Sequence, residues 1–278
     1  MWRLDWGRAT NLIRIGAQAV ELWRGDRSVL TLVLQLPLPR RGSLYDADSL
    51  NEPLLALLAR LDGEQASVIL ESAFAPVLLA DTGGGLTSGT LVTALLRHRF
   101  GLAYAEHGVD IASWKIRTDY RFGDRYALGF ALPPAVETVL VEVSSSAGIA
   151  FTEWRPALAW SLDRLNPARG WVKGSGWWIW REQDRSLIVR LDQGRVAVLN
   201  PAVQIGEAVS DVERSIATEL VGSGIARDTG PIGVGQWQLH EDAFGSSQRL
   251  RLFSVTARRP ATSQAPTRKA LETEGAPA

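Results

Sequence analysis

The sequence contains no cysteine and only three histidines, His98, His107 and His240. Without cysteine, the chain has no disulfide bonds, no thiol catalysis and no zinc–thiolate sites. No two histidines lie four residues apart, the spacing at which two imidazoles on one helix share a metal ion. We therefore expect no histidine-based metal site.

The chain also lacks net charge and long apolar runs. Its 278 residues include 30 Lys plus Arg and 30 Asp plus Glu. This balance gives no electrostatic basis for nucleic-acid binding, which needs a basic surface. No window approaches the roughly 18 apolar residues of a membrane helix, and the start MWRLDWGRAT lacks the layout of a signal peptide. We expect neither a nucleic-acid partner nor a transmembrane segment.

Strand-like and helix-like segments follow one another in both halves of the chain. Short apolar strands at 11–38 precede a leucine-rich helix after Asp48 and a second helix near 88–106. A hairpin follows, and then a helix that begins at Pro134 and ends before Gly148. The second half repeats this order. Because strands and helices do not alternate strictly, the pattern predicts two α/β lobes and not a simple doubly wound sheet.

Segments between about residues 66 and 200 carry a family resemblance. They are VILESAFAPVLL, RHRFGLAYAE, WKIRTDY, ALGFALPPAVETVL, GIAFTEWRPALAWSLDRLN and WWIWREQDRSLIVRLDQGRVAVL. In their order and in their apolar, Trp and Pro landmarks they resemble the divergent actin-like proteins of the PilM type, from type IV pili, and the cytoplasmic domain of the type II secretion L component. The resemblance implies a two-lobed actin-like (ribonuclease-H-like) α/β fold with a hairpin-bearing insertion in the first lobe.

This resemblance also suggests how the chain is divided. We expect a first lobe at 1–150 that includes an inserted helix–hairpin–helix subdomain at about 88–148. A second lobe is expected at 151–258. The last residues, 259–278, are rich in Pro, Ala and Thr and are expected to be disordered.

The resemblance further implies a role at a membrane. It predicts a cytoplasmic protein, peripheral to the bacterial inner membrane, that acts as a non-catalytic scaffold. Its partners would be a membrane-anchored pilus or secretion platform protein and, as a further candidate, the ATPase of the machine. Two alternatives stay open: an ATP-binding or ATP-hydrolysing actin-like protein, and a Trp-rich ligand-binding module.

Two hairpins mark where an actin-like protein holds the phosphates of ATP. The first normally presents Asp-x-Gly, whose carboxylate orients magnesium. Here it reads IRIGAQAVEL, with Gly16 in place and Arg14 where the acid would be, and a guanidinium cannot ligate magnesium. The second hairpin, WWIWREQDRSLIVRL, offers Glu182 and Asp184 but no flanking glycine. We expect a degenerate nucleotide site at Arg14, Gly16 and Glu182, with no catalytic residues and no required cofactor.

A glycine triplet at 83–85 stands between Asp81 and Ser88. Such a segment is typical of a phosphate loop, because glycines let the backbone approach an anion at a helix N-terminus. We expect instead a connection that ends a strand at Asp81 and caps a helix with Ser88.

A tryptophan cluster at Trp177, Trp178 and Trp180 allows two interpretations. Large aromatic side chains dominate protein cores, so most of these rings are expected to pack inward. The alternative is a partner-binding surface, since tryptophan is enriched at the centres of interfaces.

Overall fold

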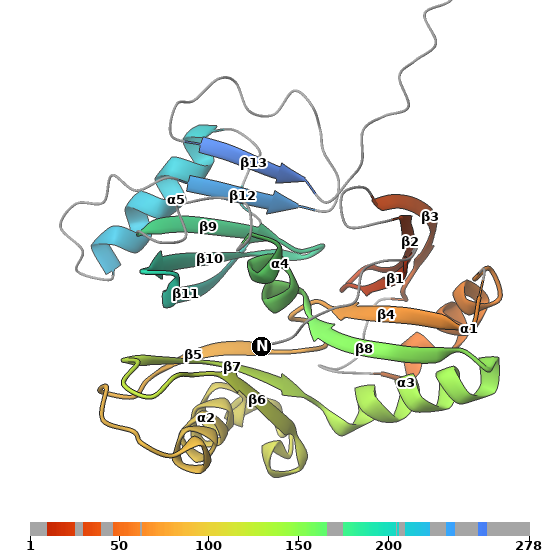
Figure 1. The fold of residues 1–278 in the computed structure, drawn as a ribbon, viewed down its shortest axis with the longest axis horizontal. Helices are drawn as coiled ribbons and strands as arrows, with labels where there is room; N and C mark the ends of the chain where they lie inside the picture. The colour runs from red at the N-terminus through yellow and green to blue at the C-terminus, as the bar shows by residue number, and fades with distance from the viewer. Residues whose placement is uncertain are drawn as a thin grey trace, which may run out of the picture.

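The computed structural model describes residues 10–25, 30–39, 47–61, 63–165, 175–203, 205, 209–222, 232–236 and 250–254. Within these ranges the chain forms three sheets and five α-helices, arranged as two lobes and an insertion (Figure 1). The tail that we expected at 259–278 lies outside the described residues.

The first lobe is built on a five-stranded sheet in the order β3-β2-β1-β4-β8. Its strands are β1 (Thr10–Ile15), β2 (Ala19–Gly25), β3 (Leu30–Pro37), β4 (Gln65–Leu70) and β8 (Ala150–Pro156). Strands β1, β2 and β3 are antiparallel neighbours, whereas β4 runs parallel to both β1 and β8. One apolar cluster joins this sheet to η1 (Asp48–Leu50), α1 (Asn51–Leu58) and α3 (Pro134–Ala147).

The second lobe repeats the topology of the first. Its strands are β9 (Gly176–Arg181), β10 (Arg185–Asp192), β11 (Arg195–Val203), β12 (Ile232–Gln236) and β13 (Leu250–Ser254). They follow the order β11-β10-β9-β12-β13, again with three antiparallel strands and then two parallel ones. Helix α5 (Val209–Gly222) packs its Val212 and Ile216 on this sheet. The β1–β2 hairpin of the first lobe therefore corresponds to the β9–β10 hairpin of the second.

The insertion is a three-stranded sheet with a helix on one face. Its strands are β5 (Val77–Asp81), β6 (Lys115–Asp119) and β7 (Tyr126–Leu132), in the order β5-β7-β6. Helix α2 (Gly89–Ala103) packs Leu96 against Gly129 of β7, where a Cβ atom would lie 2.5 Å from the leucine Cδ2. The short helices η2 (Ala105–His107) and η3 (Ile111–Ser113) lead into β6. The predicted hairpin-bearing insertion is confirmed by the antiparallel pair β6–β7.

The divisions between these parts differ from those expected. The insertion sheet already starts with β5, before residue 88. Helix α3 packs on the core of the first lobe and so does not belong to the inserted subdomain. Strand β8 pairs with β4, so the first sheet extends past residue 150 to Pro156. Each difference arises because the pairing of strands and the packing of helices depend on contacts between segments that are distant in the sequence.

An apolar cluster, which we call the interlobe cluster, fills the space between the two lobes and the insertion. Its centre consists of Trp23 of β2, Trp160 of α4 (Ala157–Leu165), and Trp178 and Trp180 of β9, none more than 2% exposed. Leu128 and Phe130 of β7, among others, join the same cluster. The lobes are thus held together by a continuous core, with Trp178 Nε1 donating to the Ser161 hydroxyl at 3.3 Å.

Trp178→Ala should lower the free energy of unfolding by about 3–5 kcal/mol, because it leaves a large cavity at the centre of the interlobe cluster. Urea denaturation measures this loss. The control is Phe122→Ala, at a ring that is 77% exposed, which should change stability by no more than about 0.5 kcal/mol. Equal losses in the two variants would contradict the assignment of Trp178 to a shared core.

Candidate functional site

The turns of the two corresponding hairpins meet between the lobes. Residues 16–18 connect β1 to β2, and residues 182–184 connect β9 to β10. The Gln183 side chain crosses from the second turn to the first, where its Oε1 accepts hydrogen bonds from the backbone N–H groups of Gln18 at 2.7 Å and Ala19 at 2.8 Å. We call this contact region the hairpin junction and define it by Arg14, Glu21, Glu71, Glu182 and Gln183.

Gln183 uses every polar atom of its carboxamide in the hairpin junction. Its Nε2 donates to the Ala19 carbonyl at 3.2 Å and to Glu21 Oε1 at 3.1 Å. Its backbone N–H donates to Glu71 Oε2 at 3.0 Å. A Cβ atom on Gly16 would lie 2.3 Å from Gln183 Cδ and 2.6 Å from Glu71 Oε2. Gly16 is therefore required for the close approach of the two turns.

Arg14 is a buried cation held between two carboxylates. Its Nε donates to Glu71 Oε1 at 2.8 Å and its Nη1 donates to Glu21 Oε2 at 2.9 Å, while Nη2 forms a second contact with Glu71. Trp23 Nε1 also donates to Glu21 Oε2, at 2.8 Å. Only 5% of Arg14 and 2% of Glu21 are exposed, and Glu71 is fully buried. Charge-assisted hydrogen bonds of this kind offset the cost of burying the ions.

Glu182 joins the junction to the end of β4. Its carboxylate accepts the Ser72 N–H at 3.0 and 3.1 Å and also accepts the Ser72 hydroxyl. Burial raises the pKa of the Glu182 carboxyl from its ordinary 4.5 to about 8, and the charge of Glu71 adds to the rise. Burial raises the pKa of Glu71 as well, although the Arg14 charge opposes the rise. The hairpin junction therefore favours a protonated Glu182 at neutral pH.

These contacts already engage most of the groups that would hold a nucleotide phosphate and its metal ion. Among the acids only Asp184 keeps a buried oxygen, Oδ1, without a hydrogen bond in the described part of the chain. The carboxylates of Glu71, Glu182 and Asp184 lie within 4.8 Å of one another, a spacing compatible with a bound cation. Arg14 and Ser72 already bind the first two, and Arg185 binds the third at 2.7 Å. Two N–H groups of the first turn that would face a phosphate, those of Gln18 and Ala19, donate to Gln183.

The structure brings together the three residues of the predicted degenerate site, Arg14, Gly16 and Glu182. Sequence reasoning missed Glu71 and Gln183. Glu71 had a usable signal, because it is the first residue after the apolar strand β4. Gln183 had none, because its role depends on the turn of another lobe, 165 positions away in the sequence.

The tryptophans of the predicted partner-binding surface are buried. Trp177 is 0%, Trp178 2% and Trp180 1% exposed. Trp177 packs beneath α5, whereas the other two rings belong to the interlobe cluster. A ring without exposed surface cannot contact a partner, so the packing interpretation replaces the partner-binding one for all three.

The glycine triplet connects β5 to α2 and contributes no residue to the hairpin junction. Asp81 Oδ1 accepts the N–H of Gly83 at 2.7 Å, and Gly83 and Gly84 adopt positive φ angles of 64° and 73°. Ser88 occupies the N-cap position of α2 but forms no side-chain capping hydrogen bond. The segment is a turn followed by a helix start, and β5 ends at Asp81 as expected, but the expected capping of α2 by the Ser88 side chain is wrong.

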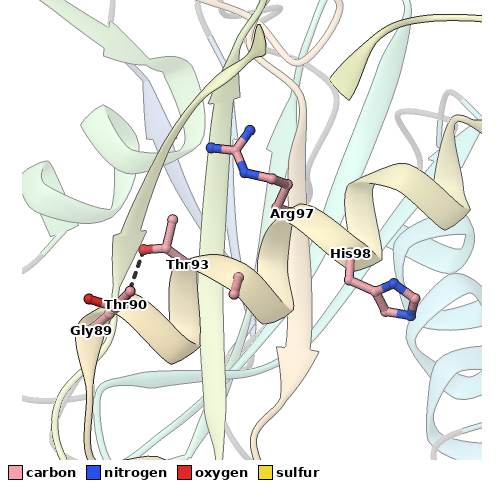
Figure 2. Close-up of a pocket in the computed structure, with 6 residues that line it drawn as sticks. Gly89, Thr90, Thr93, Arg97 and His98 are labelled. Atoms are coloured by element: carbon pink, nitrogen blue, oxygen red, sulfur yellow. Dashed lines mark hydrogen bonds between the residues drawn. The ribbon is translucent and has the colours of Figure 1, made fainter. Parts of the chain in front are cut away.

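A shallow hollow on α2 offers no second site. Figure 2 shows its lining residues Thr90, Thr93, Arg97 and His98, whose side chains do not converge on one point. Thr93 Oγ1 donates to the Gly89 carbonyl at 2.9 Å, and Arg97 donates to the carbonyls of Ile111 and Ala112 at 3.0 and 2.6 Å. Arg97 thereby joins α2 to η3, whereas the Thr93 hydrogen bond stays within α2.

Glu182→Gln should flatten the pH dependence of stability. Between about pH 4.5 and about pH 8 the folded protein keeps a proton on Glu182 that the unfolded chain releases, so the free energy of unfolding falls as the pH rises through this window. Glutamine imitates the protonated acid and removes this dependence. Urea denaturation at several pH values measures the slope, with Glu52→Gln, at an exposed residue of α1, as the control. An unchanged slope in Glu182→Gln would show that Glu182 is ionised in the folded state.

No family model matches this sequence, and no curated protein sequence matches it. Within the described ranges, no helix combines the length and apolar character that a membrane span needs.

Several solved structures share the fold over most of the chain. One is a Bacteroides thetaiotaomicron protein with an actin-like ATPase fold and unknown function, with a TM-score of 0.52, 10% identity, and coverage of 86% of this chain and 87% of that one. Another is the cytoplasmic domain of EpsL, an inner membrane component of the type II secretion system of Vibrio cholerae, with a TM-score of 0.51, 9% identity, and coverage of 88% and 90%. A chain of the PilM–PilN type IV pilus biogenesis complex has a TM-score of 0.50, 10% identity, and coverage of 81% and 80%. The duplicated sheet topology and these similarities show that the chain has a two-lobed actin-like fold, which it shares with the EpsL cytoplasmic domain and with a chain of the PilM–PilN complex.

Proposed function

We propose that this protein is a non-catalytic assembly component of a type II secretion or type IV pilus-like machine. The observation that carries the proposal is the fold shared with the EpsL cytoplasmic domain over 88% of this chain and 90% of that one. The similarity to a chain of the PilM–PilN complex supports the same role. On this proposal the protein works at the cytoplasmic side of the inner membrane, where a membrane-anchored partner holds it.

The chemistry of the hairpin junction supports a non-catalytic role. Catalysis of phosphate transfer needs a metal ion and charged groups that are free to face a substrate. In the junction, Arg14 binds Glu21 and Glu71, and Gln183 fills the first turn. These groups are engaged with one another, so ATP hydrolysis is the weaker interpretation of the fold. The Trp-rich ligand module is weaker too, because Trp177, Trp178 and Trp180 are buried.

We place the docking surface at β6, one of the two edge strands of the insertion sheet in the described part of the chain, because the other edge strand, β5, lies against β11 of the second lobe. An extended partner segment can lengthen a sheet by pairing with such an edge. Ile116 packs against the core beneath α2, whereas Lys115, Arg117 and Asp119 are exposed. Lys115 forms an ion pair with Glu137 at 2.5 Å, so the cation that favours a partner segment with acidic side chains is above all Arg117.

Co-expression with the membrane-anchored platform protein of the same machine, followed by co-purification from membranes, tests both parts of this proposal. The wild-type chain should be recovered with the platform protein. Arg117→Glu should reduce recovery about tenfold, because it places a negative charge against an acidic segment. The matched control is Arg214→Glu on α5, in the other lobe, whose side chain is 75% exposed.

Two results would contradict the proposal. Absence of any association between the wild-type chain and platform or pilus components would contradict the assembly role. Equal losses in Arg117→Glu and Arg214→Glu would place the docking surface away from β6.

A further inference from the structure

The turn of the first hairpin has the geometry of an anion-binding site. The consecutive N–H groups of Gln18 and Ala19 converge on one oxygen, Gln183 Oε1, at 2.7 and 2.8 Å. Concave turns with successive N–H groups of this kind bind phosphate and other anions. The acceptor here belongs to the chain itself, and it comes from the corresponding turn of the other lobe.

The acids beside this turn have the composition of a cation-binding site. Glu71, Glu182 and Asp184 bring their carboxylates within 4.8 Å of one another, and hard divalent cations prefer such oxygen ligands. Glu21 lies nearby, since it binds both Arg14 and Gln183. The Arg14 guanidinium is the buried cation of Glu71, which it contacts through Nε and Nη2, and of Glu21, whereas Arg185 binds Asp184.

We propose that Arg14 and Gln183 are an internal substitute for a metal ion and a phosphate group, and that this pair fixes the two lobes against each other without a nucleotide. Arg14 supplies the positive charge that the buried acids require. Gln183 supplies the oxygen that the turn requires. This inference goes beyond the docking role, because it concerns how the lobes are joined and holds for any partner.

The donors of Gln183 distinguish this substitute from a phosphate. Its Nε2 donates to the Ala19 carbonyl and to Glu21 Oε1, whereas a fully ionised phosphate can only accept hydrogen bonds. The junction is therefore complementary to a neutral carboxamide that both accepts and donates. Gly16, which has no space for a Cβ atom beside Gln183, completes the fit.

Replacement of Arg14 tests the cation part of the proposal. Arg14→Ala leaves Glu71 and Glu21 without their cation, so its Tm should fall, and a divalent cation should then substitute for the guanidinium. Addition of about 10 mM MgCl2 or MnCl2 should raise the Tm of Arg14→Ala by about 3 °C or more. The wild-type protein and the control Arg60→Ala, at an exposed residue, should shift by less than about 1 °C.

Arg14→Lys separates charge from mere packing. The ammonium group keeps the positive charge but loses the fork of donors, so the Tm should fall without any response to magnesium. A magnesium response in Arg14→Ala that is no larger than in the wild-type protein would overturn the cation part. So would an equal response in Arg14→Lys.

Replacement of Gln183 tests whether its carboxamide takes the place of a phosphate group. It keeps the proposal testable if Arg14→Ala does not fold. Gln183→Ala should speed the hydrogen exchange of the Gln18 and Ala19 amides about fivefold or more, because both lose their acceptor. Gln35→Ala, at an exposed residue of β3, is the control and should leave these amides unchanged. In calorimetric titration the wild-type protein should bind no Mg–ATP. Unchanged exchange in Gln183→Ala, or Mg–ATP binding by the wild-type protein, would overturn the proposal.

Discussion

The arrangement of the lobes depends on the hydrogen bonds between the Gln183 carboxamide and the turn of the β1–β2 hairpin. The duplicated topology directs two corresponding hairpins toward each other, and backbone N–H groups at such turns cannot be left without acceptors. Gln183 satisfies Gln18 and Ala19 of the opposite lobe and binds Glu21 of the next strand. A single side chain thereby connects both halves of the fold.

The pairing of the charges around Gln183 also depends on the contact between the two hairpins. The apolar cluster around Trp23, Trp160 and Trp178 excludes water beside the hairpin junction, and low polarity makes each unpaired charge costly. Arg14 forms ion pairs with Glu71 and Glu21, and Glu182 keeps a proton because burial raises its pKa to about 8. Removal of one partner from a buried ion pair typically costs about 3–5 kcal/mol. The junction is therefore a set of mutually dependent groups.

A closed junction suits the assembly role that we propose, because that role needs surfaces in a fixed arrangement. The insertion sheet is held against the second lobe by Arg195 of β11, whose Nη1 and Nη2 contact Asp119 at 3.4 Å and Asp124 at 3.3 Å. The edge strand β6 of the insertion sheet therefore has a defined position relative to the second lobe. In an actin-like fold the same cleft can serve a nucleotide, but here its polar groups serve the fold.

Local signals in the sequence determined much of the architecture, and long-range packing decided the rest. Pro134 and Gly148 mark the first residue and the C-cap of α3, and the apolar runs around Gly16 and Glu182 define the two hairpins. These features depend on neighbouring residues, so the resemblance to actin-like proteins was visible in the sequence. Only the tertiary structure could join Arg14 to Glu71, 57 positions away, and Gln18 to Gln183, 165 positions away. It also placed β4 and β5 in different sheets and buried the tryptophans of β9, because sheet partners and burial are set by how distant segments pack.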